Sequence, residues 1–354
     1  MTWDPKPVVP LDRRSLRTGL AIAVAIGVTA GLVVAFATGG TAVVVAASKL
    51  SLPWLALALA LSALSWLLQG IGLAALTRRG AKGHVLGMTA AFIGGDFAAL
   101  VSPFGSGSIP ASVFCLTREG LSAGESSAVV AMHSVLTGAS FLIMGVAAAV
   151  VLQAQAAAAR TFVWSAVTII AVALAFAVWL AARPHWAIGR IEGALARPGL
   201  ATLLGHERAS RVSEVVGREA HRFASDVETL TRERPWQLAL SFLCVFASRG
   251  CLILCLPVVM YGLGSRGPTL PMLATGVGAM ALAVISPTPG GSGAVEGGTA
   301  VLLVAQAPIA LAGATTLLWR GVTYYSELLL GWFVFTRYLT TRPKAREESD
   351  AGRS

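Results

Sequence analysis

The stretches ALVSPFGSGSIPA at 99–111 and AVISPTPGGSGAVE at 283–296 decide the expected fold, because they resemble one another inside an otherwise apolar chain. Aligning Ser102 with Ser286 gives an offset of 286 − 102 = 184 residues, and identical residues recur upstream at this offset. The identical pairs are Gly83/Gly267, Leu86/Leu270, Met88/Met272, Ala90/Ala274, Gly94/Gly278, Ala99/Ala283 and Pro103/Pro287. A chance match of two Ala/Gly-rich segments is the alternative, and the shared Ser-Pro sequence argues against it.

Each copy is an apolar run that ends at a Ser-Pro and continues into a glycine-rich stretch. Proline lacks an amide donor and glycine loses more backbone entropy than any other residue, so a helix does not continue well through this composition. The sequence therefore predicts two helices that break near 102–108 and 286–293.

The composition places the chain in a bilayer. Apolar residues make up 55% and charged residues only 12% of the 354 residues, against roughly 25% charged in soluble domains. A hydrocarbon core needs about 20 apolar residues per spanning helix. Stretches of that length lie near 18–38, 53–76, 124–152, 161–182, 236–262 and 311–335. We expect six spanning helices, the first of which is retained because no cleavage site of a signal peptide is evident.

The cations mark the cytoplasmic side. Lys and Arg outnumber Asp and Glu by 27 to 17, and they gather before residue 18, after 76, between 183 and 234 and after 336. By the positive-inside rule both termini face the cytoplasm, and this placement disfavours nucleic acid as the partner. Valine, leucine and phenylalanine recur at helical spacing within 183–235, which predicts an amphipathic connector whose arginines meet anionic headgroups. A solvated connecting helix is the alternative.

Counting crossings from a cytoplasmic N-terminus makes block 83–117 enter and leave from the cytoplasm and block 267–310 enter and leave from outside. Both blocks are then re-entrant helical hairpins, and the two halves form an inverted-topology repeat. Irregular backbone at this depth must be buried in protein or face a wet cavity. Ten ordinary spanning helices remain the alternative.

The expected organisation is an all-α integral membrane protein in five parts. These are a cytoplasmic N-terminus (1–17), a first membrane half (18–182), the connector (183–235), a second membrane half (236–337) and a disordered cytoplasmic tail (338–354).

Ionisable side chains at bilayer depth are costly and are by default functional candidates. Arg320 and Glu327 are seven residues apart and would share a helix face. We expect Arg320 to receive a lipid phosphate, since its planar fork suits oxyanions, with glycine amides of the second break as further donors. The predicted substrate-binding residues are Arg320, Glu296, Ser286, Pro287, Thr288, Gly290 and Gly291, with Asp96, Ser102, Pro103, Ser106, Arg249 and Glu327. The alternative is that Arg320 only pairs with Glu296 or Glu327.

The run SPTPGGSGAVEGG at 286–298, followed by Leu318-Trp319-Arg320-Gly321, resembles the flippase-like domain in the membrane part of lysylphosphatidylglycerol synthases and related stand-alone bacterial proteins. The resemblance covers about residues 15–337. It implies a multi-pass protein of the bacterial cytoplasmic membrane that moves lipids or lipid-linked substrates between leaflets. The soluble aminoacyl-transferring domain of the synthases has no counterpart here, so we do not expect an enzyme.

Three other functions stay open. An ion-coupled transporter of a small soluble anion could use the same cavity, with Asp96 or Glu296 as proton carrier. An enzyme acting on a lipid carrier is disfavoured because the non-cytoplasmic loops are short and poor in carboxylates. An accessory subunit beside a lipid-modifying enzyme is the third. No cofactor is expected, since the four cysteines lack metal-ligand spacing and no nucleotide-binding loop occurs.

Overall fold

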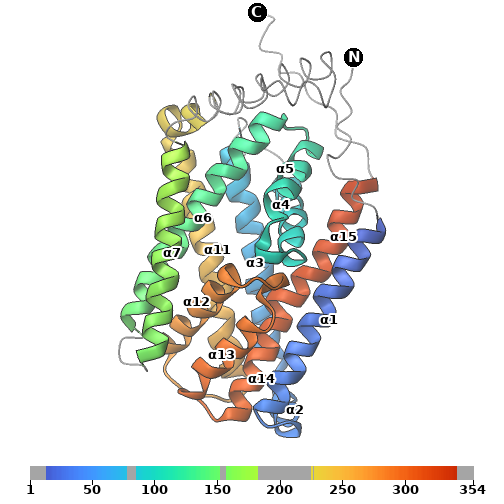
Figure 1. Cartoon of the computed structure of the whole chain (residues 1–354), viewed down its shortest axis with the longest axis vertical. Coiled ribbons are helices and arrows are strands. Elements are labelled where there is room, and N and C mark those ends of the chain that lie inside the picture. The colour runs from blue at the N-terminus through green and yellow to red at the C-terminus, as the bar shows by residue number, and fades with distance from the viewer. Residues whose placement is uncertain (1–12, 78–84, 152–156, 182–224, 226, 341–354) are drawn as a thin grey trace, which may run out of the picture. The chain divides into compact units, whose positions relative to one another are not determined.

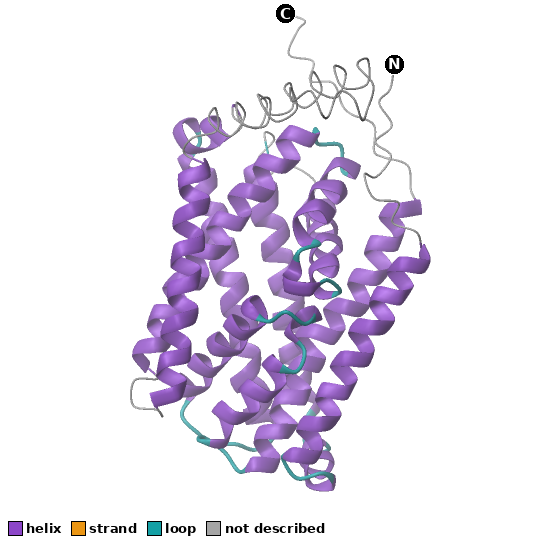
Figure 2. Cartoon of the chain, viewed as in Figure 1, coloured by secondary structure: helices purple, strands orange, loops and turns teal. Residues whose placement is uncertain are grey.

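The computed structural model describes residues 13–77, 85–151, 157–181, 225 and 227–340. Every element in these ranges is helical, which confirms the all-α prediction for the described part of the chain. Figure 2 shows helices joined by short loops. The chain divides into two compact units, with boundaries that fall inside α3, α4 and α11 and at the start of α5.

The first unit comprises 1–62, 93–108 and 253–341. Its elements are α1 (Arg13–Ala37), α2 (Thr41–Ala47), the start of α3 (Leu52–Leu76), the end of α4 (Val85–Leu100) and the 3-10 turn η2 (Pro103–Gly105). After the end of α11 (Pro235–Gly262) come α12 (Thr269–Ile285), the 3-10 turn η5 (Pro289–Gly291), α13 (Ala294–Val304), α14 (Ile309–Arg320), the π turn η6 (Gly321–Tyr325) and α15 (Ser326–Thr340). Figure 1 shows α1 running beside α14 and α15.

Small residues let the helices of this unit approach closely. A Cβ added at Gly313 on α14 would lie 2.0 Å from Thr38 Oγ1, and one added at Gly331 on α15 would lie 2.7 Å from Phe97 Cβ. The buried apolar cluster between the helices includes Met260, Met272 and Leu303. Close packing through small residues is how helices associate where lipid is the solvent.

The second unit comprises 63–92, 109–252 and 342–354. Its described elements are the rest of α3, α4 and α11, with α5 (Ser108–Arg118), α6 (Ala123–Val151), α7 (Ala157–Ala181) and the π turn η4 (Thr229–Glu233). Gly138 and Gly145 bring α6 against α7, and His133 Nε2 lies 2.8 Å from Gln69 Oε1. This histidine is a packed helix residue with a side-chain partner.

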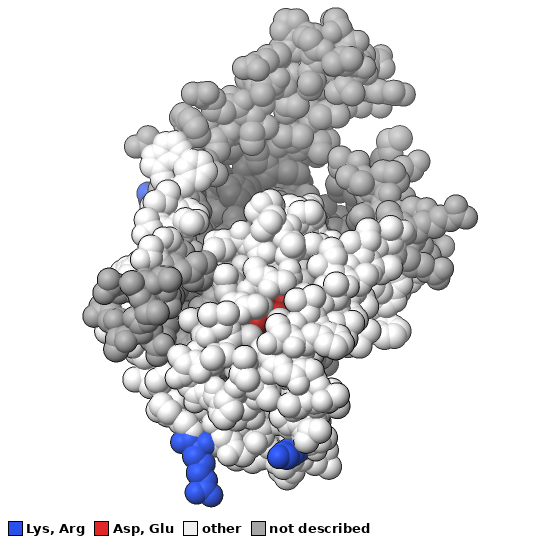
Figure 3. Space-filling model, turned by 60° about the horizontal axis from the view of Figure 1, so that its bottom comes forward, with Lys and Arg blue, Asp and Glu red and all other residues white. Residues whose placement is uncertain are grey.

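Four helices in the described residues are long and apolar enough to cross a membrane. They are Thr18–Ala37, Leu52–Leu76, Ala123–Val151 and Pro235–Gly262. The other two expected spans correspond to α7 and to α14 with α15, which η6 separates. In the view of Figure 3 the described surface is almost free of charged atoms, as suits contact with hydrocarbon. These features indicate a multi-pass membrane protein.

Some expectations lie outside the described residues or need adjustment. Most of the predicted connector (183–235), and most of the predicted N-terminal segment and tail, lie in ranges that the structure does not describe. The short helix α2 was not expected from the sequence. Residues 309–310, expected in the second hairpin block, begin α14.

Candidate functional site

The two predicted breaks have the same backbone. Phe104 (φ 53°, ψ 19°) and Gly290 (φ 58°, ψ 17°) adopt the left-handed conformation, and the next residues, Gly105 and Gly291, do too (φ 64° and 69°). We call residues 101–107 tip 1 and residues 286–293 tip 2. Phe104 is the non-glycine residue with positive φ among the described residues, and the left-handed region is costly for a bulky side chain.

The correspondence between the tips corrects the sequence alignment. The identical residues before the tips follow an offset of 184, but the left-handed pairs differ by 290 − 104 = 186 and the helices after the tips start at 294 − 108 = 186. The second copy therefore holds two more residues than the first by the end of its tip, and tip 2 has eight residues against seven in tip 1. In the structure Pro103 corresponds to Pro289, because each directly precedes the left-handed residue of its tip. The pairing of Pro103 with Pro287 appears only when the two sequences are aligned without a gap.

The two tips lie side by side in the first unit. The turn η2 lies beside η5, and both lie beside α12. Tip 1 is open, because Pro103 and Ser106 are exposed and Phe104 is 65% exposed. Within tip 1 the Gly107 amide donates a hydrogen bond to Ser102 Oγ at 2.8 Å.

Tip 2 is closed by its own hydrogen bonds. Ser286 Oγ and Thr288 Oγ1 lie 2.8 Å apart, and the Thr288 hydroxyl donates to the Ser292 carbonyl at 2.7 Å. The Gly291 amide donates to the Thr288 carbonyl at 3.0 Å. Pro287 is exposed. The predicted site residues of tip 2 therefore stabilise the conformation of the tip itself. The Gly291 amide already donates to a backbone carbonyl of the tip.

An ion pair ties tip 2 to α14. Arg320 Nε donates to Glu296 Oε1 at 2.8 Å, and the two side chains are only 6% and 1% exposed. Arg320 Nη2 donates to the Gly290 carbonyl at 3.0 Å and lies 3.5 Å from Ser292 Oγ. The guanidinium carbon lies 3.9 Å from the centroid of the Tyr324 ring.

The other oxygen of Glu296 caps α13. Glu296 Oε2 accepts a hydrogen bond from the Gly293 amide at 2.6 Å, as the carboxylate half of a capping box does. The arginine contact and the helix N-terminus together compensate this buried carboxylate. Arg320 and Glu296 therefore pair with one another.

A pocket of about 380 Å³ opens beside this pair. Ser292 and Gly293 of tip 2 line one side, and α1 lines the other. The lining residues of α1 are Ala25, Ile26, Thr29 and Ala30. The pocket thus reaches the N-terminal end of α13, and Ser292 lies between it and the Arg320 guanidinium.

The other charged residues of the predicted site are Glu327, Asp96 and Arg249. Glu327 is buried in the first turn of α15, and Asp96 is half-buried on α4 with no hydrogen bond or ion pair to another described residue. Arg249 belongs to the second unit, where its guanidinium lies 5.1 Å from the centre of the Phe141 ring.

Three residues near this ion pair were not among the predicted substrate-binding residues. Tyr324 follows Arg320 by one helical turn, and this spacing was the available signal. Ser292 and Gly293 stand in the quoted repeat but were not singled out. The pocket-lining part of α1 is apolar and small-chained, and such residues carry no signal of a site.

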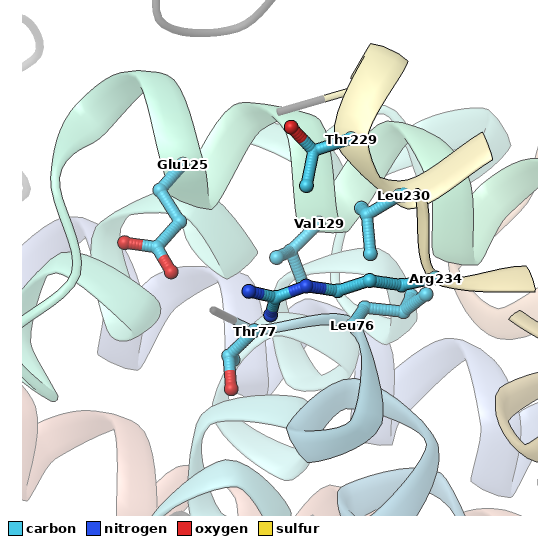
Figure 4. Close-up of a pocket in the computed structure, with 7 residues that line it drawn as sticks. All are labelled: Leu76, Thr77, Glu125, Val129, Thr229, Leu230 and Arg234. Atoms are coloured by element: carbon cyan, nitrogen blue, oxygen red, sulfur yellow. The ribbon is translucent and has the colours of Figure 1, made fainter. Parts of the chain in front are cut away.

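A second, much smaller pocket lies in the second unit. Leu76, Thr77, Val129, Thr229 and Leu230 line it, and Figure 4 shows the Glu125 and Arg234 side chains extending toward one another there. Its volume is about 10 Å³, which is room for about one water. It is too small for a lipid headgroup.

A comparison with protein families gave one match. The family described as "Lysylphosphatidylglycerol synthase TM region" matches residues 20–331. A search of curated proteins gave no match.

Proposed function

This chain belongs to the family of the lysylphosphatidylglycerol synthase TM region, and from that premise we propose that it translocates a phosphate-bearing lipid or lipid-linked intermediate across the membrane. The family match and the apolar helices are consistent with a lipid-related membrane protein. The proposal adds the activity and the site.

The observation that carries the proposal is the pair of adjacent tips with matching left-handed backbone, one of which is fastened to an intramembrane arginine. Transporters build substrate sites from broken helices that meet near the bilayer midplane. In the proposed topology the blocks 83–117 and 267–310 are re-entrant hairpins of opposite orientation, and six helices span the membrane. The two halves rock around the tips.

Arg320 is the phosphate ligand in this proposal. Its guanidinium is the described cation at tip 2, and a planar fork binds phosphate oxygens in pairs. The pocket beside α1 admits the headgroup. Ser102, Ser106 and Asp96 on the first hairpin would face the substrate from the opposite side. The protein acts without a chemical step, so no enzyme activity or cofactor is part of the proposal.

The proposed setting is the bacterial cytoplasmic membrane with both termini in the cytoplasm. Anionic headgroups at the cytoplasmic surface, and a lipid-modifying enzyme, are the proposed partners.

An ion-coupled transporter of a small soluble anion is the second candidate. The observation that favours it is the carboxylate of Glu296, which is 1% exposed and pairs with the same arginine that would bind the anion. Such a carboxylate can carry a proton with the substrate.

The test of the proposed function has two parts. Native mass spectrometry identifies the lipids that the purified wild type retains, and proteoliposomes containing headgroup-labelled phospholipid measure translocation by the fraction of label that an impermeant quencher reaches. Arg320→Ala should lose both the selectively retained lipid and the translocation, and Glu296→Ala should lose the translocation.

Arg232→Ala and Glu228→Ala are the matched controls, because these residues form an exposed pair at 78% and 56% exposure. We expect them to behave as the wild type. Retention that mirrors bulk membrane lipid in every variant, with no translocation by the wild type, would contradict the proposal and favour the anion transporter.

A further inference from the structure

Tip 2 already holds an anion, and that anion is part of the chain. Glu296 accepts hydrogen bonds from Arg320 Nε at 2.8 Å and from the Gly293 amide at 2.6 Å. A guanidinium and a helix N-terminal amide are the donors that phosphate groups use in proteins. The Glu296 carboxylate therefore stands where the phosphate of a ligand would stand.

The surroundings offer room and a further donor. The 380 Å³ pocket reaches Ser292 and Gly293, at the end of α13 where the first amides have no partner within the helix. The Tyr324 side chain is 3% exposed, its ring lies under Arg320, and its hydroxyl interacts with Ser292 of the tip. A Cβ placed on Gly290 would lie 2.8 Å from that hydroxyl oxygen, so this donor lies at the tip itself.

We infer that Glu296 is a built-in competitor for the phosphate site, and that binding of a phosphodiester to Arg320 and the Gly293 amide displaces Glu296 with uptake of one proton. The inference rests on the proposed role of Arg320 as phosphate ligand. It adds that anion binding and protonation of Glu296 are one coupled step. The proton comes from the aqueous phase and returns to it when the phosphodiester leaves.

Charge balance is the physical reason for the coupling. Arg320 and Glu296 together are neutral, and both are almost fully buried. Adding a singly charged phosphodiester would leave a net negative charge beside two side chains that are only 6% and 1% exposed, which is costly. One proton on Glu296 restores neutrality and frees both donors for the ligand.

No other described carboxylate near α13 can take this role. The elements packed against α13 are α12, α14 and α1. In the described residues α12 has no ionisable side chain, α14 has Arg320 alone, and α1 carries its arginines in its first turns, well before the pocket-lining residues 25–30. The π turn adds the phenols Tyr324 and Tyr325, which are neutral near pH 7.

Calorimetry of the wild-type protein tests the inference directly. The purified full chain in detergent micelles is titrated near about pH 7 with dioctanoyl phosphatidylglycerol, and separately with dimethyl phosphate, in two buffers of different ionisation enthalpy. Both probes keep one negative charge near this pH, so any proton taken up belongs to the protein. We expect about one proton per bound phosphodiester.

The titrations with the two probes distinguish four outcomes. Saturable binding without proton uptake overturns the inference and leaves the proposed lipid site standing. Binding of neither probe overturns both. Binding of the lipid with proton uptake, but not of dimethyl phosphate, supports the inference with a lipid as ligand; equal binding of both probes with proton uptake supports it with a free anion as ligand.

Glu296→Gln gives a second test, because glutamine cannot take up the proton. We expect it to bind the lipid probe about tenfold more tightly than the wild type at about pH 8, with no proton uptake. Glu228→Gln, on the exposed pair, is the matched control and should keep the wild-type proton count. Proton uptake that persists in Glu296→Gln overturns the inference, and if this variant does not fold, the wild-type count still decides.

Discussion

Breaking the buried ion pair from either side should destabilise the protein strongly, and breaking it from both sides should cost no more. Arg320→Met leaves the Glu296 carboxylate at 1% exposure without its cation, and Glu296→Gln leaves the guanidinium at 6% exposure without its anion. An uncompensated buried charge costs about 3–5 kcal/mol. In the double variant neither charge remains unpaired. We expect it to lose about 3–5 kcal/mol, against the roughly 6–10 kcal/mol that additivity would require.

The assay is reversible unfolding in mixed micelles with increasing sodium dodecyl sulfate, followed by tryptophan fluorescence. Trp319 adjoins Arg320 and is 3% exposed, so its emission reports on this region. The control cycle uses Arg232→Met and Glu228→Gln in the exposed pair, where we expect about 0–1 kcal/mol of coupling. Losses at Arg320 and Glu296 that add within about 0.5 kcal/mol would refute the reasoning, because the two side chains would then not stabilise one another.

Three further predictions concern the tips and the pocket. Gly290→Ala should lower the free energy of unfolding by more than about 2 kcal/mol, since its Cβ would lie 2.1 Å from the Tyr324 ring at a φ of 58°; Gly297→Ala, with nothing within 4 Å, is the control in the same unfolding assay. Phe104→Gly should raise the free energy of unfolding by about 0.5–1 kcal/mol, because it removes a left-handed aromatic residue, and a loss of stability would contradict this account. Thr29→Trp should fill the pocket beside α1 and abolish selective lipid retention in native mass spectrometry without changing the secondary structure seen by circular dichroism; unchanged retention would separate the pocket from the ligand.

The sequence predicted where the helices break, and the physical reason is local. Proline and glycine act through their own backbone, so Ser102-Pro103 and Ser286-Pro287 end helices whatever surrounds them. The two-residue change of offset between the copies was beyond such reasoning. Tip 2 contains both Ser286-Pro287 and Thr288-Pro289, and either dipeptide matches Ser102-Pro103 until the backbone angles are known.

The pairing of Arg320 with Glu296 was one of two open alternatives in the sequence. Charge and depth made both residues candidates, but 24 residues and a turn between helices separate them, and sequence patterns do not fix such a contact. The pocket could not be predicted from the sequence for another reason. Its α1 wall consists of small and apolar side chains, which look the same whether they face lipid or line a cavity. Re-entrance of the hairpins and the inverted repeat remain predictions.

The π turn after Arg320 has a consequence for helix phase. A turn closed by i→i+5 bonds takes one residue more than an α-helical turn, so α15 is rotated by about one residue, or roughly 100°, from the phase it would have as a plain continuation of α14. Glu327 is therefore turned off the face that a spacing of seven would share with Arg320. Deleting a single residue within 321–325 would close this turn with α-helical bonds and leave the residues beyond it facing as they do now, so the one extra residue of this turn, and not the spacing of seven, decides which face Glu327 takes.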